Sequence, residues 1–88
     1  MLRLFKKSVL SKNERLLLKI IPKEYRFLAR NKNGLLVAFK KEPEKQNDCS
    51  WTDYRFNSNR NLKMFNHLFK FITFEDDRAY SMKVLRRM

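Results

Sequence analysis

The sequence predicts a small α+β domain, in which an N-terminal helix is followed by an antiparallel β-sheet and by further short elements. Three observations predict this fold: a helix-capping motif at residues 11–14, a hairpin signal at residues 25–40, and an apolar fraction of 43% that includes eight Phe. So many apolar residues favour a folded core over disorder. Because 88 residues can bury only one adequate core, we expect a single domain spanning residues 1–88.

Residues 1–10 form a basic, amphipathic segment in which Leu2, Phe5 and Val9 share one helical face, beside Lys6 and Lys7. The segment fits several interpretations: a stripe packed on the domain's own core, a flexible basic arm, a helix docked on a membrane surface or a partner, and an organelle presequence. No apolar run reaches the roughly 18 residues that a spanning helix needs. We therefore expect a soluble or peripheral protein.

A helix is predicted to start at Lys12, because Ser11 and Glu14 form the S-x-x-E capping box. Pro22 disfavours helical geometry at the residue before it, so the helix should end near Ile20. Spacings of three and four residues place three cations in one stripe along this helix, namely Lys12, Arg15 and Lys19.

Two strands, at residues 25–30 and 35–40, are predicted on either side of the turn sequence NKNG. A two-residue turn would set Phe27 opposite Lys40, whereas a three-residue loop with a bulge at Gly34 sets Phe27 opposite Phe39. Only the three-residue loop collects the apolar side chains on one buried face, which would consist of Tyr25, Phe27, Ala29, Val37 and Phe39. We therefore predict the register of the three-residue loop.

A polar loop at residues 40–50 is expected to lead into a third strand of the same sheet at residues 51–56. Tyr54, Arg55 and Arg60, among several Asn, mix aromatic, basic and amide groups as surfaces that stack on bases and contact phosphates do. A core Trp51 and a polar loop explain the same composition, so both interpretations stay open.

The last third of the chain gives mixed signals. Apolar residues at helical spacing predict a short helix after an Asn61 cap, whereas FKFITFE, at residues 69–75, alternates as a strand does. From Asp76 onward, acids at the start and bases at the end suit a helix dipole, but Tyr80, Met82 and Val84 alternate as in a strand. The terminal element is left open, with the helix favoured.

The formal net charge of +12 is the main functional signal. Residues 1–30 carry nine positive and two negative charges, net +7, while residues 31–60 and 61–88 carry net +2 and +3. Such an imbalance repels itself unless an anionic partner offsets it. We therefore expect a nucleic acid, or an acidic protein surface, as the partner, with a second basic tip at Arg86 and Arg87.

Nothing in the sequence indicates catalysis, a metal or a cofactor, so we expect a protein that is not an enzyme. Cys49 is the only cysteine, which points to a reducing compartment and leaves no partner for a disulfide. His67 has no second histidine with which to share a metal. The acids at residues 75–77 are adjacent, whereas a nuclease needs acids that converge from separate elements.

The segments PKEYRFLARNKNGLLVAFKKEPEK and HLFKFITFEDD, with Trp51 between them, resemble a group of small accessory proteins encoded by phages and prophages of Gram-positive bacteria. The similarity spans about residues 22–77. This chain departs from the group's pattern at four positions, where it is more basic or lacks a Trp: Asn31, Asn33, Phe74 and Arg78. The resemblance implies the bacterial cytoplasm as the location, and an action by stoichiometric binding to a host polymerase, replication factor or defence nuclease such as a CRISPR effector.

The expected function is therefore that of a non-enzymatic phage-type accessory protein that binds nucleic acid or a host nucleoprotein and so regulates or inhibits host machinery. The alternatives are a simple DNA- or RNA-binding module, and a membrane-surface or protein-interaction module that uses the basic N-terminus. The residues expected to contact the partner are Lys6, Lys7, Lys12, Arg15 and Lys19, then Tyr54, Arg55 and Arg60, and finally Arg86 and Arg87.

Overall fold

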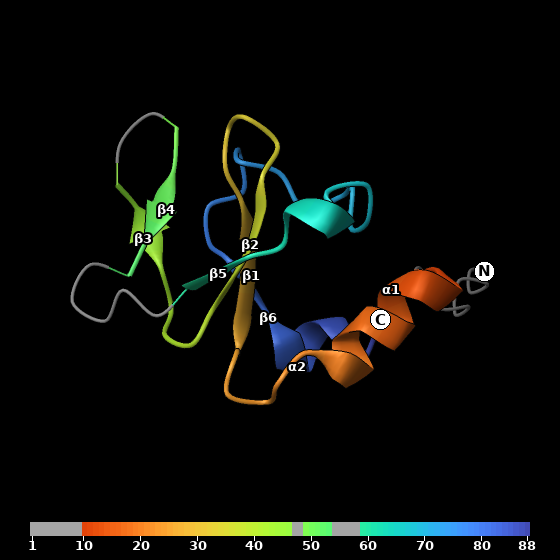
Figure 1. The fold of residues 1–88 in the computed structure, drawn as a ribbon. Coiled ribbons are helices and arrows are strands. Elements are labelled where there is room, and N and C mark those ends of the chain that lie inside the picture. The colour runs from red at the N-terminus through yellow and green to blue at the C-terminus, as the bar shows by residue number, and fades with distance from the viewer. Residues whose placement is uncertain (1–9, 47–48, 54–58) are drawn as a thin grey trace, which may run out of the picture.

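An antiparallel sheet with the strand order β5-β2-β1-β6 forms the centre of the computed structural model, which describes residues 10–46, 49–53 and 59–88. Its strands are β1 (Phe27–Arg30), β2 (Leu36–Phe39), β5 (Asn59–Asn61) and β6 (Tyr80–Ser81). The helices α1 (Lys12–Ile20) and α2 (Met82–Leu85) lie on one side of the sheet, and the hairpin β3 (Glu44–Lys45) and β4 (Trp51–Thr52) lies on the other (Figure 1). The predicted α+β fold is confirmed.

The capping box at the start of α1 is confirmed by both of its hydrogen bonds. The Glu14 amide donates to Ser11 Oγ at 3.1 Å, and the Ser11 amide donates to Glu14 Oε1 at 2.8 Å. The helix ends at Ile20 as predicted, because Ile21 is extended ahead of Pro22. Leu17 and Leu18 are its buried residues.

The hairpin register is also confirmed, with Phe27 opposite Phe39 and Ala29 opposite Val37. The Asn31 amide donates to the Leu35 carbonyl at 2.9 Å, which leaves residues 32–34 as a three-residue loop. Gly34 has a φ of 95°, a backbone conformation that residues with a Cβ rarely adopt.

Both faces of this hairpin are buried, which the sequence did not predict. Phe27, Ala29, Val37 and Phe39 pack with Trp51 in the smaller of two core clusters. The other face contributes Leu28, Leu36 and Ala38 to the larger cluster, which α1, α2 and the segment 62–72 complete. The assignment of Tyr25 was wrong: it packs in the larger cluster, because β1 starts only at Phe27 and the alternation of faces does not extend back to Tyr25.

The predicted third strand is in the wrong sheet. Trp51–Thr52 pairs with Glu44–Lys45, inside the stretch predicted to be a polar loop, and not with the β1–β2 hairpin. The third and fourth strands of the main sheet are β5, beside β2, and β6, beside β1. The Trp51 indole nevertheless ties the small hairpin to the sheet, since its Nε1 donates to the Arg30 carbonyl at 3.1 Å.

The short helix expected after β5 is reduced to a single 3₁₀ turn, η2 (Lys63–Phe65), whose N-cap is Leu62 and not Asn61. Asn61 still contributes, because its Oδ1 accepts from the Lys63 amide at 2.6 Å. The strand expected at residues 69–75 is not formed. The chain turns there instead, and the buried Phe69 adopts a positive φ of 55°. Both alternatives for the terminal element are partly right, because the two-residue strand β6 continues directly into α2.

Arg30 holds this turning segment to the hairpin. Its side chain is buried and donates to five backbone carbonyls at 2.6–2.9 Å, those of Gly34, Asn66, Leu68, Phe69 and Ile72. Burial lowers the pKa of Arg30 below its ordinary value, because removal from water disfavours the charged form. Five carbonyl dipoles therefore replace the water that the guanidinium has lost.

Candidate functional site

Cations from both ends of the chain meet where α1 and α2 come together. A cavity of about 550 Å³ is lined by Lys23, Arg26, Lys83 and Arg86, and a second one of about 230 Å³ by Arg15, Lys19 and Arg86. Arg86 belongs to both, so the two cavities adjoin. We call the surface of these two cavities the basic groove. Six cations line it: Arg15, Lys19, Lys23, Arg26, Lys83 and Arg86.

The wall formed by the N-terminal part of the chain follows from local structure. Arg15 and Lys19 are four residues apart on α1, so they project from the same side, separated by about 6 Å along the helix axis. Leu18, buried between the helix and the core, forms the floor beneath them. Lys23 and Arg26 follow in the connection that runs from Pro22 to the start of β1. The groove therefore extends from α1 to the edge of the sheet.

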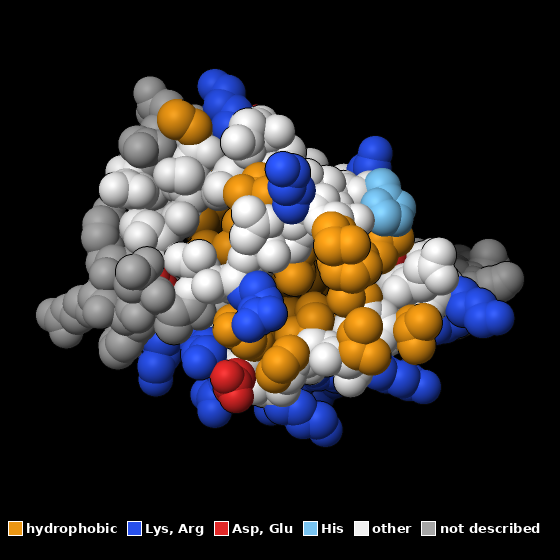
Figure 2. Space-filling view, viewed as in Figure 1, with side chains coloured by type: hydrophobic (Ala, Val, Ile, Leu, Met, Phe, Trp, Pro, Cys, Tyr) orange, Lys and Arg blue, Asp and Glu red, His pale blue; other side chains and the backbone are white. Residues whose placement is uncertain are grey.

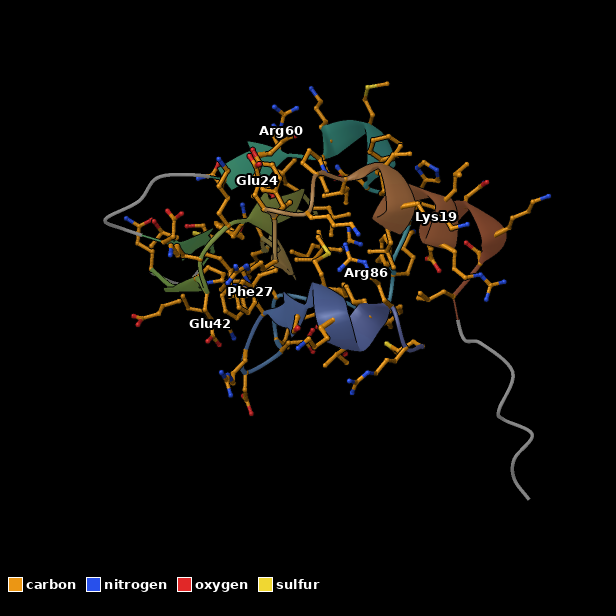
Figure 3. The ribbon with its side chains drawn as sticks, turned by 90° about the horizontal axis from the view of Figure 1, so that it is seen from below. Lys19, Glu24, Phe27, Glu42, Arg60 and Arg86 are labelled. Carbon is orange, nitrogen blue, oxygen red and sulfur yellow. The ribbon has the colours of Figure 1, made fainter. Side chains whose placement is uncertain are left out.

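The opposite wall is α2 and the residue after it. Ser81 caps this short helix, accepting a hydrogen bond from the Lys83 amide at 3.1 Å, and Arg86 ends it. In Figure 3, Arg86 lies between α1 and α2, on the same side of the molecule as Lys19. Backbone hydrogen bonds join the two walls, because the Met82 amide donates to the Arg26 carbonyl at 2.7 Å.

The charges of the groove are not neutralised within the described part of the chain. None of its six cations forms an ion pair with a described Asp or Glu, and neither cavity is lined by one. Two acids are adjacent in sequence to groove cations: Glu24 pairs with Lys40 Nζ at 3.0 Å, and Glu14 accepts from the backbone amides of Ser11 and Phe69. A concave surface lined by one sign of charge concentrates the field and attracts ions of the opposite sign.

A different arrangement surrounds Tyr25, at the edge of the groove. Lys40 Nζ lies 5.4 Å and the Arg60 guanidinium carbon 5.8 Å from the centre of its ring, so two cations occupy its surroundings. The hydrogen bond and the charge of Glu24 together raise the pKa of Lys40 above its ordinary value of 10.5. Arg60 thus packs against an aromatic ring on the sheet side and does not line the groove.

The neighbouring cavity, of about 380 Å³, shows that not every hollow of this protein is basic. It is lined by Glu42, Asp76 and Arg78 together with apolar side chains. Arg78 donates to Glu42 Oε2 from Nε at 2.9 Å and from a terminal nitrogen at 2.6 Å. Its cation is compensated by acids, unlike the cations of the basic groove.

The structure brings together three of the residues expected to contact a partner, Arg15, Lys19 and Arg86. Lys12 and Arg87 are exposed but line neither cavity, and Arg60 lies beside Tyr25. Lys6, Lys7, Tyr54 and Arg55 lie outside the described residues.

Sequence reasoning missed Lys23, Arg26 and Lys83 as groove residues. The sequence could have indicated Lys23 and Arg26, since they continue the basic N-terminal run past Pro22. Lys83 gives no local signal, because its place in the groove depends on the pairing of β6 with β1, which brings residues 80–86 back to the start of the sheet.

An exposed apolar strip accompanies the cations of α1. The side chains of Leu16 and Ile20 are 56% and 64% exposed, one helical turn apart. Figure 2 shows hydrophobic side chains gathered over α1 and toward η2, with Lys and Arg side chains along the lower edge of that face.

Within the residues that the structure describes, no three His, Cys, Asp or Glu come together as a metal site would require. Cys49 and His67 are both exposed. None of the helices in the described ranges is long and apolar enough to cross a bilayer.

Comparisons with protein families, with curated proteins and with solved structures find no match for this chain. The similarity to small phage-encoded proteins therefore stays a prediction from the sequence. The basic groove has to be interpreted from its own chemistry.

Proposed function

We propose that this protein is a non-enzymatic accessory protein that binds the phosphate backbone of nucleic acid, free or within a host nucleoprotein, through the basic groove. The observation that carries the proposal is the convergence of six cations, from α1, the turn before β1, and α2, that form no ion pair with any described acid. A stoichiometric binder of this kind would regulate or inhibit host machinery by covering nucleic acid that a polymerase or a defence nuclease needs.

The grouping of like charges supports a polyanion as the ligand. Cations spread over a surface solvate it at little cost, but cations gathered around one hollow repel one another. Phosphates would remove that repulsion and would release the counterions condensed on the nucleic acid, which is a large part of the binding free energy. Lys and Arg are also the side chains that proteins use most for phosphate contacts.

The inhibitory part of the proposal comes from the resemblance to phage accessory proteins. Such proteins act by occupying a surface, which needs no catalytic group. A chain of 88 residues with a preformed basic hollow fits that mode of action.

The test compares two triple variants that change the net charge by the same amount. Lys19→Glu, Lys83→Glu and Arg86→Glu alter the groove, whereas Lys32→Glu, Lys63→Glu and Lys70→Glu alter exposed lysines that line neither cavity. Binding to fluorescein-labelled duplex DNA, single-stranded DNA and structured RNA is followed by fluorescence anisotropy. Circular dichroism verifies that both variants fold.

We expect the groove variant to lose roughly a hundredfold or more in affinity and the control variant only a few-fold. For the unaltered protein, six phosphate contacts imply a loss of about a thousandfold between 50 and 200 mM salt. Equal weakening of the two variants would show that total charge, and not the groove, determines binding. Weak binding of the unaltered protein to all three nucleic acids at low salt would contradict the proposal and point to an acidic protein surface.

A second candidate function is docking on an anionic membrane surface, which the exposed Leu16 and Ile20 favour because cations flank them on α1. Sedimentation with vesicles of phosphatidylserine and phosphatidylcholine tests it. Co-sedimentation that is lost in Leu16→Gln/Ile20→Gln would favour this candidate, and unchanged binding of that variant to nucleic acid would separate the two functions.

A further inference from the structure

The groups that line the basic groove determine which features of a nucleic acid it can recognise, if the proposed function holds. Sequence-tolerant single-strand binders use exposed aromatic rings on which bases stack. Sequence-specific binders use amide and carboxylate side chains, as well as arginine, against base edges.

Two aromatic residues line the groove, and neither offers a free ring face. Tyr25 is only 8% exposed, and Lys40 and Arg60 lie over its ring. Phe27 is half-buried and packs in the smaller core cluster with Ala29 and Trp51. A base entering the groove would therefore find no stacking platform among the described residues.

The polar groups of the lining are almost entirely cationic. No Asn, Gln, Asp or Glu lines either cavity in the described part of the chain. The single hydroxyl apart from that of Tyr25 belongs to Ser81, and it already accepts the hydrogen bond from the Lys83 amide. The remaining groups are three lysines and three arginines, which suit phosphates and leave adenine and cytosine edges without their usual partners.

Charge density then decides which nucleic acid binds most tightly. A duplex carries about one phosphate per 1.7 Å of its axis, which is twice the density of one of its strands. Without stacking to compensate, a single strand offers the groove fewer phosphates and also has to be ordered on binding. We propose that the basic groove binds duplex nucleic acid in preference to single strands, through phosphate contacts that do not depend on base sequence.

The proposal rests on the proposed function and is tested on the unaltered full-length protein. The probes are three 24-base-pair DNA duplexes of unrelated sequence, one RNA duplex, and the component single strands, all in the same buffer. We expect the duplex DNA dissociation constants to agree within about threefold, and the single strands to bind roughly tenfold more weakly. The dependence of log K on log salt should have a slope of about −5 for six contacts.

Single strands that bind as tightly as the duplexes, or duplexes that differ more than tenfold among sequences, would overturn this inference while leaving the proposed function intact. Failure of every probe to bind would overturn the proposed function itself. The RNA duplex tests whether the groove distinguishes RNA from DNA, since both duplexes offer the same phosphate chemistry. Binding to both kinds of duplex, or to one of them, still supports the inference.

Two single variants distinguish phosphate contacts from stacking. Phe27→Leu should leave the ratio of duplex to single-strand affinity unchanged, because the ring packs in the core. Lys83→Ala should reduce the steepness of the salt dependence by about one unit, and Lys63→Ala, outside the groove, should not. A Phe27→Leu variant that selectively loses single-strand binding would contradict the inference.

Discussion

Glu14 and Phe69 are joined by a hydrogen bond across 55 positions of the sequence, in which the Phe69 amide donates to Glu14 Oε2. The other carboxylate oxygen of Glu14 accepts from the Ser11 amide and completes the capping box. One carboxylate therefore both starts α1 and anchors the segment that turns through Phe69, whose carbonyl accepts from Arg30.

This double role predicts that Glu14→Ala destabilises the protein more than Ser11→Ala does. Ser11→Ala removes one capping bond and should cost about 1 kcal/mol. Glu14→Ala removes the reciprocal bond and leaves the buried segment at Phe69 without its anchor, so we expect about 2–3 kcal/mol. Urea unfolding followed by fluorescence of Trp51, the only tryptophan, measures both. Equal costs would show that the bond to Phe69 contributes nothing.

Arg30→Lys is predicted to be severely destabilising despite the conserved charge. A lysine has three donors against the five carbonyls that Arg30 satisfies, so buried acceptors would be left unpaired. We expect a loss of about 2–4 kcal/mol, or a fall in Tm of roughly 10 °C or more. Arg78→Lys, at an exposed side chain, is the matched control and should change Tm little. Similar Tm values for the two variants would contradict a stabilising role of the five hydrogen bonds from Arg30 to backbone carbonyls.

Gly34→Ala tests backbone strain separately from crowding. An added Cβ would meet no atom within 4 Å, so the cost arises from the φ of 95° alone. We expect a loss of about 1 kcal/mol in the free energy of unfolding. Gly34→Asn should cost less, because asparagine tolerates positive φ better. An alanine variant as stable as the original would mean that the hairpin adopts another loop.

Leu16→Ala and Leu17→Ala form a matched pair on neighbouring positions of α1. Leu16 is 56% exposed, and Leu17 is 4% exposed within the larger core cluster. We expect less than about 0.5 kcal/mol for Leu16→Ala, and about 2–5 kcal/mol for Leu17→Ala. Thermal unfolding followed by circular dichroism checks the difference. A large cost at Leu16 would indicate that its side chain is covered in solution.

The ion pair between Lys40 and Glu24 predicts a loss of stability at alkaline pH. The pKa of Lys40 is raised, because Glu24 accepts its hydrogen bond and carries the opposite charge. A raised pKa in the folded state gives stability that is complete below the ordinary value of 10.5 and is lost as pH rises through the folded value. The difference in Tm between the unaltered protein and Glu24→Gln should therefore be small but positive at pH 8 and absent above the folded pKa of Lys40. A difference that persists at the highest pH would assign it to another contact.

Local chemistry made part of this fold predictable. The capping box and Pro22 determine the two ends of α1, and the hairpin register follows from which pairing places Ala29 opposite Val37. Where elements depend on distant partners, the sequence was misleading. The alternation in residues 69–75 predicted a strand, but the hydrogen bonds that Phe69 donates to Glu14 and accepts from Arg30 hold it in a turn.

The candidate site was predictable to the same extent. Helical spacing, a local property, predicted that Arg15 and Lys19 share one side of α1, and both line the same cavity, whereas Lys12 of the same stripe does not. The approach of Arg86 and Lys83 to them depends on a two-residue pairing between β6 and β1, for which no local pattern exists. For Arg30, outside the groove, the sequence held one clue to its hydrogen-bonded environment. It shares a strand face with the buried Leu28, where an unpaired charge would be costly.

The hydrogen bonds that Arg26 makes on both sides have a thermodynamic consequence for binding. Its amide donates to the Phe39 carbonyl, and its carbonyl accepts from the Met82 amide. The two walls of the groove are therefore hydrogen-bonded to the same part of the sheet, strands β2, β1 and β6. The cations therefore need little backbone ordering when a ligand arrives. Association should be fast, with a small change in heat capacity, and the selectivity of the groove should come from the ligand's shape and stiffness more than from any adjustment of the protein.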